Sequence, residues 1–237
     1  MLLLLVDTAG TTGGILLAQS DSELPTAENT RVLGAASLPP RESSIRMIPA
    51  IADLLQASHY ILANVDAFAV VSGPGSFTGL RVGLSAVKAM AEATGKPIAA
   101  LSRLAVLAST AGIAETVHAV LDAGRGEFYH GMYRDGDGTC IGESLETLST
   151  LVDSLQAIPG KIVASEQPVL NALAEFAPNQ IPEVSVQDAL PLALAAWQSR
   201  RFTDVALLDA NYLRRHDVEM PPKRASQESA GTRRSES

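Results

Sequence analysis

The chain opens with the apolar run LLLLVD at residues 2–7, which is typical of a strand buried on both faces of a sheet. A stretch of turn formers follows, and Ile15–Ala18 then reads as a second strand. The same order recurs at Val117–Leu121, which runs into Asp122, a Gly-Arg-Gly turn and a second apolar stretch. Two such units predict an internal duplication. Two unrelated hairpins are the alternative, because Asp and Gly are common in turns.

Helices and strands alternate along the rest of the chain, which predicts a mostly parallel or mixed α/β sheet. The first helix is expected to be capped by Ser43 or Ser44, and Pro49 either lies in its first turn or kinks it. Gly95 is expected to end the second helix. The predicted elements are helices at Ser43–Ala57, Phe77–Thr94, Arg103–Ala111 and Leu190–Arg201, and strands at Ala67–Ser72, Ile98–Leu101 and Lys161–Ala164.

Composition excludes several classes of protein. The 237 residues include 18 Lys and Arg against 26 Asp and Glu, a net charge of -8 that does not suit a chain binding nucleic acid alone. Cys140 is the single cysteine, so a disulfide framework and a multi-cysteine zinc site are excluded. The apolar run at the start is too short for a signal peptide or a membrane helix. We therefore expect a cytoplasmic protein that does not contact membranes.

The most informative stretch is GPGSFTGLRVG at residues 73–83, between a predicted buried strand and a helix. Ser76 can cap that helix, and the free N–H groups at its start would suit an anion. The spacing matches neither a P-loop nor a dinucleotide-binding loop. A tight strand-to-helix turn without a ligand is at least as good an interpretation. The residues of this glycine loop that we single out are Gly73, Pro74, Gly75, Ser76, Phe77, Thr78, Gly79 and Arg81.

Both N-terminal helices carry two apolar stripes. In the first helix Ile45, Ile48, Ala52 and Leu55 form one stripe, and Met47, Ile51 and Leu54 form the other. In the second helix Leu80, Leu84, Val87 and Ala91 form one stripe, and the mostly small residues Gly83, Ala86 and Met90 form the other. One stripe on each helix must cover the chain's own sheet. The other either packs against a partner or is buried in the same core, and the pattern alone does not decide.

Catalytic groups are scarce in the sequence. No two of the four histidines have a helical spacing, so a metal site on one helix is not expected. Cys140 has no basic neighbour and is expected to be inert. Asp7 and Thr8, at the end of the first strand, could contact a nucleotide or a cation, although a turn-capping aspartate is the commoner role.

Four segments together resemble the TsaB (YeaZ) family. They are LVDT at residues 5–8, SGPGSFTGLRVG at 72–83, DAGRGEFY at 122–129 and YLR at 212–214. The resemblance runs in the same order over about residues 2–215. Ser43 stands where the family has His, in Arg41-Glu42-Ser43-Ser44, and Ala210 stands where it has Pro.

The resemblance implies an actin/Hsp70/sugar-kinase-like fold of two duplicated lobes. The expected division is an N-terminal lobe at residues 1–102 and a C-terminal lobe at 103–215 whose last segment packs back on the first lobe. Residues 221–237 have almost nothing apolar and are expected to form a disordered tail.

The resemblance also implies a function. TsaB-like proteins are non-catalytic subunits needed to form threonylcarbamoyladenosine at position 37 of tRNAs that read ANN codons. They dimerise with the catalytic paralogue TsaD. An ATPase called TsaE docks on this pair, and tRNA is contacted indirectly, through the complex. No cofactor is expected in the isolated chain, and ATP or ADP is expected only at the interface of the complex. Because its apolar helices are expected to be exposed, the free chain is expected to be able to form a self-dimer. An independent ATPase or small-molecule kinase of the same fold is the competing hypothesis.

The family's partner interface is formed by helices of the N-terminal lobe, so the resemblance favours a partner surface for the second stripes. The interface residues that it implies here are Arg41, Ser44, Met47, Ile48, Ile51, Leu54, Leu55, Gly83, Ala86, Val87 and Met90.

Overall fold

The first of two sheets is built from the N-terminal part of the chain. In the computed structural model, which describes residues 1–112, 115–134, 139–211 and 213, this sheet has five strands in the order β3-β2-β1-β4-β5. Strand β1 is antiparallel to β2 and parallel to β4, and it is buried throughout. The strands are β1 (Leu2–Asp7), β2 (Gly13–Ser20), β3 (Thr30–Leu38), β4 (Ala67–Gly73) and β5 (Ile98–Ser102).

The second sheet repeats the first. Its order is β10-β9-β6-β7-β8, so in each sheet the first strand lies between the second and the fourth, with the third and fifth at the edges. Strand directions also match, because β6 is antiparallel to β7 and parallel to β9. The predicted duplication is therefore confirmed. The strands are β6 (Thr116–Gly124), β7 (Glu127–Arg134), β8 (Thr139–Thr147), β9 (Lys161–Ala164) and β10 (Asn179–Gln180).

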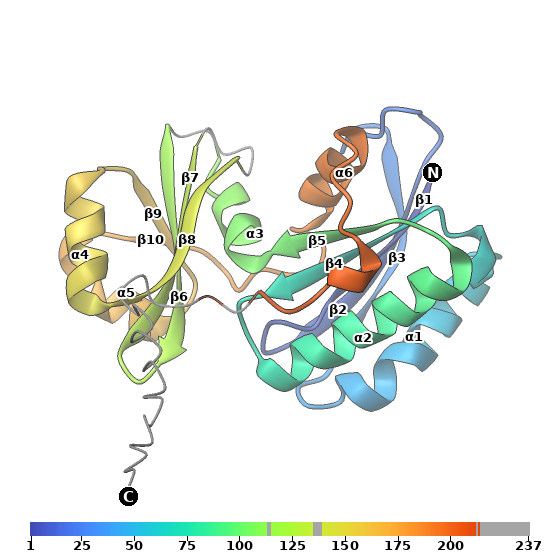
Figure 1. The fold of residues 1–237 in the computed structure, drawn as a ribbon, viewed down its shortest axis with the longest axis horizontal. Coiled ribbons are helices and arrows are strands. Elements are labelled where there is room, and N and C mark those ends of the chain that lie inside the picture. Colours follow the sequence, from blue (N-terminus) through green and yellow to red (C-terminus); the bar gives the residue numbers. More distant parts are fainter. Residues whose placement is uncertain (113–114, 135–138, 212, 214–237) are drawn as a thin grey trace, which may run out of the picture.

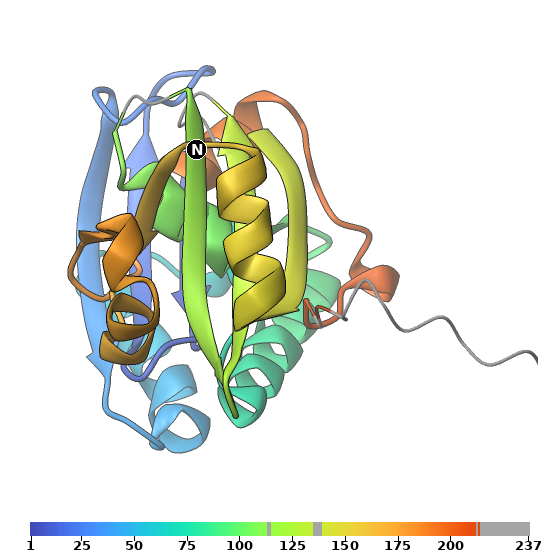
Figure 2. The ribbon, with the colours of Figure 1, turned by 90° about the vertical axis from the view of Figure 1, so that its left-hand side faces the viewer.

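Helices fill the space around the two sheets (Figures 1 and 2). Helices α1 (Ser43–Ala57) and α2 (Phe77–Thr94) cover one face of the first sheet, and α3 (Arg103–Ser109) lies between the sheets. Helices α4 (Leu148–Ala157) and α5 (Gln167–Ala172) cover the outer face of the second sheet, whereas α6 (Leu190–Gln198) returns to β5. Short 3-10 helices occur at Leu62–Asn64, Ala174–Phe176 and Val205–Leu207.

The start of α1 differs from the prediction. Neither Ser43 nor Ser44 caps the helix: Glu42 is the N-cap residue, and its side chain makes no capping hydrogen bond. The Glu42 carbonyl accepts the N–H of Ile45 and of Arg46, at 3.0 and 2.9 Å, so the serines already lie inside the first turn. The helix continues through Pro49, which is exposed, and therefore does not begin there.

The end of the described chain lies against the first lobe. The Thr203 N–H donates to the Ile98 carbonyl at 2.7 Å, and the Asn211 N–H donates to the Ser72 carbonyl at 2.8 Å. Tyr212, Arg214 and the predicted tail at residues 221–237 lie outside the described residues. Within the described ranges, no helix combines the length and the apolar character needed to cross a bilayer.

Candidate functional site

Three glycines, one just before α2 and two on one side of the helix, form a groove that receives the turn after β1. A methyl group on Gly79 would lie 2.1 Å from the Thr8 carbonyl oxygen, and one on Gly75 would lie 2.2 Å from the Ala9 carbonyl oxygen. A methyl group on Gly83 would lie 2.3 Å from the Thr8 hydroxyl oxygen. Side chains at these positions would therefore push the turn away from the helix. We call Gly75, Gly79 and Gly83 the glycine groove.

Hydrogen bonds hold the turn in the groove. The Thr8 hydroxyl donates to the Gly79 carbonyl at 2.7 Å, and the Ser76 N–H donates to the Ala9 carbonyl at 2.9 Å. The Ser76 hydroxyl accepts the Gly79 N–H at 3.3 Å, so its predicted capping role is confirmed. The N–H groups of Ser76 and Gly79, at the start of the helix where an anion could bind, therefore donate to atoms of the chain itself.

The rest of the glycine loop divides between core and surface. Gly73 and Pro74 are buried at the end of β4, whereas Ser76 and Thr78 are exposed. Phe77 and Arg81 lie on the outer side of α2, where the Arg81 guanidinium stacks 3.7 Å from the centre of the Phe77 ring.

Asp7 caps the turn that fills the groove. Its carboxylate accepts the Ala9 N–H at 2.8 Å, and Asp122, at the equivalent place in the second lobe, accepts the Gly124 N–H at 2.8 Å. Asp7 is only 3% exposed, and burial raises its pKa, which the Ala9 N–H and the Arg103 guanidinium offset only in part. The duplicated aspartates therefore have the same local role of capping a turn.

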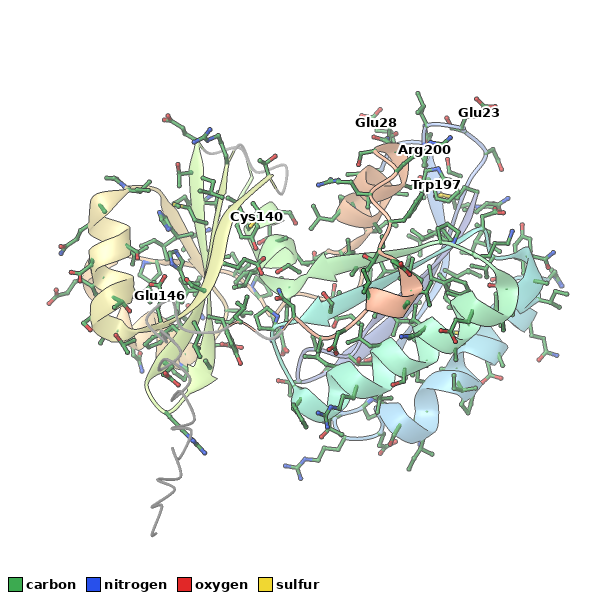
Figure 3. The ribbon with its side chains drawn as sticks, viewed as in Figure 1. Glu23, Glu28, Cys140, Glu146, Trp197 and Arg200 are labelled. Atoms are coloured by element: carbon green, nitrogen blue, oxygen red, sulfur yellow. The ribbon has the colours of Figure 1, made fainter. Side chains whose placement is uncertain are left out.

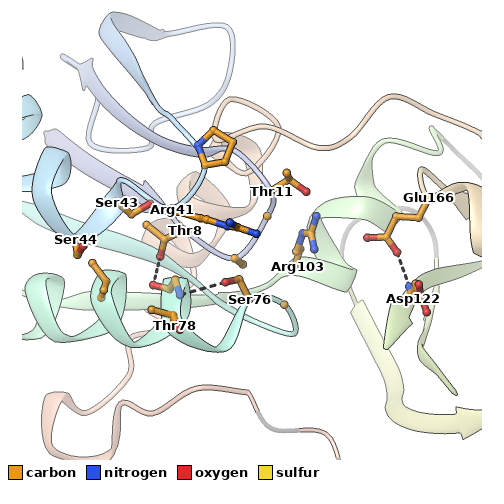
Figure 4. Close-up of a pocket in the computed structure, with 16 residues that line it drawn as sticks. Thr8, Thr11, Arg41, Ser43, Ser44, Ser76, Thr78, Arg103, Asp122 and Glu166 are labelled. Carbon is orange, nitrogen blue, oxygen red and sulfur yellow. Dashed lines mark hydrogen bonds between the residues drawn. The ribbon is translucent and has the colours of Figure 1, made fainter. Parts of the chain in front are cut away.

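A cavity of about 630 Å³ opens between the lobes beside this turn (Figure 4). Arg41 and Arg103 line it together with hydroxyl groups of the N-terminal lobe, and Asp122 and Glu166 line it from the C-terminal lobe. Charges of both signs thus face the same space. The cavity lies where the competing hypothesis of a kinase or ATPase would put its nucleotide.

Arg103 lines the cavity and pairs with a carboxylate that lies outside the cavity lining. Its guanidinium is buried and pairs with Glu183 at 3.3 Å, while its Nε atom has no hydrogen-bond partner. Glu166 accepts the Asp122 N–H, and burial raises the pKa of the Glu166 carboxyl.

Metal ligands and reactive thiols are not assembled in the described part of the chain. In it, no three His, Cys, Asp or Glu side chains are arranged to hold a metal ion. Burial and the nearby Glu143 raise the pKa of the Cys140 thiol, which lowers the fraction of reactive thiolate and agrees with the inert thiol predicted.

The residues expected at a partner interface fall into two groups. Six of them are buried in the core of the chain itself, because α1 and α2 turn these stripes toward the sheet and toward Thr8; they are not on the surface of the folded chain. They are Met47, Ile51, Leu55, Gly83, Val87 and Met90. The other five are exposed or half-buried: Arg41, Ser44, Ile48, Leu54 and Ala86.

Large apolar side chains remain exposed on the same two helices. Ile45 is 74% exposed and Ile48 53% exposed on α1, next to the exposed Ala52, and Phe77 is 53% exposed on α2. Both helices lie on the side of the sheet that faces solvent (Figure 1). We call these four residues the helical face. The interface residues implied by the resemblance do not include Ile45, Ala52 or Phe77. The sequence predicts a stripe of Ile45, Ile48, Ala52 and Leu55, of which Leu55 is buried and the other three are exposed.

Comparison with known proteins identifies the family. Residues 37–218, more than half of the chain, match the family model described as TsaD, tRNA N6-adenosine threonylcarbamoyltransferase. The chain belongs to this family. Its relatives include the tRNA threonylcarbamoyladenosine biosynthesis protein TsaB of Escherichia coli, 36% identical over 113 residues (46% of this chain and 49% of the relative), and that of Bacillus subtilis, 32% identical over 139 residues (58% and 57%). The matches span about half the length of these curated relatives.

A solved structure agrees with these relatives. A Pseudomonas aeruginosa protein described by its similarity to peptidase YeaZ aligns with a TM-score of 0.71 and 27% identity, over 90% of this chain and 99% of its own. The resemblance to TsaB (YeaZ) proteins and the actin/Hsp70/sugar-kinase-like fold predicted from it are confirmed.

The glycine groove predicts that Gly79→Ala destabilises the fold. The new methyl group would overlap the Thr8 carbonyl, so we expect the free energy of unfolding to fall by about 2 kcal/mol or more. Alanine's better helix propensity, about 1 kcal/mol, would not offset this. Urea denaturation measures the change. Gly142→Ala on β8 is the control, since nothing lies within 4 Å of the added methyl group. If the two variants were equally stable, the claim that the glycine groove has no room for a side chain at Gly79 would be contradicted.

The raised pKa of Asp7 predicts that Asp7→Asn stabilises the protein at neutral pH. The pKa of Asp7 is higher in the folded chain than in the unfolded chain. The folded protein therefore loses stability as pH rises through the pKa of the folded state. Asparagine keeps an oxygen for the Ala9 N–H without the buried charge. We expect a gain of about 1 kcal/mol at pH 7 that disappears near pH 3, measured by denaturation across pH with the exposed Asp21→Asn as control. A loss of stability at pH 7 would contradict it.

Proposed function

We propose that this chain is a non-catalytic subunit that pairs with a TsaD-like transferase and supports threonylcarbamoyladenosine formation at position 37 of tRNAs that read ANN codons. The observation that carries the proposal is the helical face. Its apolar side chains are exposed on α1 and α2, the two helices that cover one face of the first sheet (Figure 1). The chain belongs to a family whose description names that transferase reaction, and this supports a role in the same modification.

The helical face has the properties of a docking surface. Ile45, Ile48 and Phe77 are large, apolar and more than half exposed on neighbouring helices. Burying one such side chain is worth about 1.5–3 kcal/mol, so a partner that covers all three gains much of the affinity of a specific complex. Helices of a TsaD-like protein are the proposed occupant, because the TsaB resemblance implies a bundle between N-terminal lobes. Without that partner, a second copy of the chain is the proposed occupant.

The cavity between the lobes fits a supporting role. It reaches α1 at Ser43 and Ser44, near Ile45 of the helical face, so a partner docked there would cover its mouth. We propose that ATP or ADP, where the complex holds it, binds at this interface rather than in the isolated chain. A TsaE-like ATPase would dock on the assembled pair, and tRNA would be bound mainly by the partners because this chain is acidic.

An independent ATPase or small-molecule kinase is the second candidate. The observation in its favour is the same cavity, which brings Arg103 near the Asp122 and Glu166 carboxylates of the C-terminal lobe. The two candidates differ in what the isolated chain does. Turnover of ATP by the purified chain at about 1 s⁻¹ or faster would support the second candidate and overturn the first.

Reconstitution of the modification tests the first candidate. A TsaD-like enzyme, a TsaE-like ATPase, the activated threonylcarbamoyl donor and an unmodified tRNA would be combined with and without this chain. We expect modified adenosine to form only when the chain is present. Full modification without it would contradict the proposal.

The helical face predicts that Ile48→Glu prevents pairing with the TsaD-like partner. A carboxylate buried without a counter-charge in an apolar interface costs about 3–5 kcal/mol, a loss of at least a hundredfold in affinity. Ile48 is half exposed, so the isolated chain should fold as before. Ile141→Glu, at an exposed isoleucine of β8, is the control and should pair normally. Unchanged co-elution of the Ile48 variant would remove the helical face from the interface.

A further inference from the structure

Two histidines and a glutamate meet beneath α4, far from the cavity and the helical face. His118 on β6 and His130 on β7 stack with ring centres 5.2 Å apart, and their nearest nitrogens are 2.9 Å apart. Glu146 on β8 lies 3.1 Å from the other His130 nitrogen (Figure 3). Both imidazoles are buried, at 0% and 4% exposure. This cluster was not predicted from the sequence, because the two histidines meet across neighbouring strands and not along one helix.

The contacts form a single line of hydrogen bonds. The line runs from the Ile158 carbonyl to His118 Nε2 at 2.9 Å, from His118 Nδ1 to His130 Nε2, and from His130 Nδ1 to Glu146 Oε1. Each of these three contacts needs one hydrogen. Two neutral imidazoles supply only two, because each carries one N–H. The third hydrogen must be an additional proton, shared among His118, His130 and Glu146.

We propose that His118, His130 and Glu146 form a proton-binding site that fastens α4 to the second sheet. Both ends of the line reach α4: the Ile158 carbonyl belongs to the residue that ends the helix, and the Ser154 hydroxyl donates to Glu146 at 3.4 Å. Ser144 donates to the same carboxylate at 2.6 Å. With one shared proton the three ionisable groups are neutral together, which suits a buried site.

The surroundings favour one extra proton and oppose a second. Burial, and then the charge of His130, lower the pKa of His118. Burial works against ionisation of Glu146, but the hydrogen bonds from His130 and Ser144 outweigh it and hold the pKa of this carboxyl below its usual value. A fourth hydrogen would also put an N–H on both His118 Nδ1 and His130 Nε2, so that two donors would face each other with no acceptor between them.

No other charged group faces the site from the described elements packed on it. Toward the site, α4 presents Ser154 while its Asp153 is exposed, and β9 carries Lys161, whose ammonium donates to the Ala111 carbonyl. On β8, Ser144 and Glu146 are the polar groups of the line. The loop after α4 packs against His118 at Gly160, where an added methyl group would lie 2.9 Å from the His118 ring. Among the described residues, the line of hydrogen bonds is thus the route by which we expect pH to act on this contact of α4.

The sign of the pH effect follows from counting protons. Above about pH 6.5 the unfolded chain holds two protons on these three groups, while the folded site holds three. Folding then takes up one proton, and stability falls as pH rises until the folded site loses its proton. Between about pH 4.5 and 6.5 the unfolded chain holds four, so acid also weakens the folded state. The site therefore fastens α4 best near neutral pH.

Glu146→Gln separates this proposal from a purely structural hydrogen-bond line. The glutamine amide can donate to His130, so all three contacts are satisfied by two neutral imidazoles without the extra proton. We expect the full-length variant to fold. The ratio of its unfolding equilibrium constant to that of the wild type should change tenfold per pH unit between pH 6.5 and 8, since one proton is involved. His59→Asn, at an exposed histidine, should follow the wild type.

Nitrogen NMR of histidine-labelled protein counts the hydrogens directly. We expect three ring N–H groups on His118 and His130 together in the wild type at pH 7, and two in Glu146→Gln. Amide exchange in α4 should quicken as the wild type is taken to high pH, relative to α2 and after correction for intrinsic exchange. Two ring N–H groups in the wild type with Glu146 ionised, or equal pH dependence of the wild type and the Glu146→Gln variant, would overturn the proposal.

Discussion

The close approach of the β1–β2 turn to α2 is the contact on which the N-terminal lobe depends. Thr8 and Ala9 lie so near the helix that Gly75, Gly79 and Gly83 have no room for a side chain. The contact fixes the end of the central strand against the start of the longest helix. It also decides how α2 is rotated, and therefore which of its side chains are buried and which face solvent. In the stripe of Gly83, Ala86 and Met90, which in sequence resembles a surface for another helix, Gly83 and Met90 are turned inward and Ala86 is half-buried.

The same contact bears on function. A strand-to-helix turn rich in glycine is a suitable place for a phosphate. Here the Ser76 N–H donates to the Ala9 carbonyl of the β1–β2 turn, and the Gly79 N–H donates to the Ser76 hydroxyl. Asp7 is used to cap that turn. The glycine loop thus serves the fold, and the groups left over for contact with other molecules lie on the outer side of α1 and α2. A supporting subunit that presents those helices to a catalytic paralogue is the function that fits this division best.

Much of the fold was predictable from local patterns, and the site less so. The bounds of α1 and α2 follow from apolar periodicity and from Gly95 as a helix stop, and the duplication follows from the repeated strand and aspartate. Strands β3 and β8 escaped prediction because both lie at sheet edges, where exposed residues break the apolar run. Periodicity found the two stripes of α1 but could not assign them, since Met47 and Ile48 differ by only about 100° around the helix. The pair of His118 and His130 depends on strand register, which no single segment encodes.

Amide hydrogen exchange of the chain with and without a TsaD-like partner tests the central claim most directly. The account predicts slower exchange on complex formation in Ser43–Ala57 and Phe77–Thr94, the two helices of the helical face. The second sheet and α4, on the other lobe, should exchange as in the free chain. Protection confined to the C-terminal lobe, with α1 and α2 unchanged, would contradict the account.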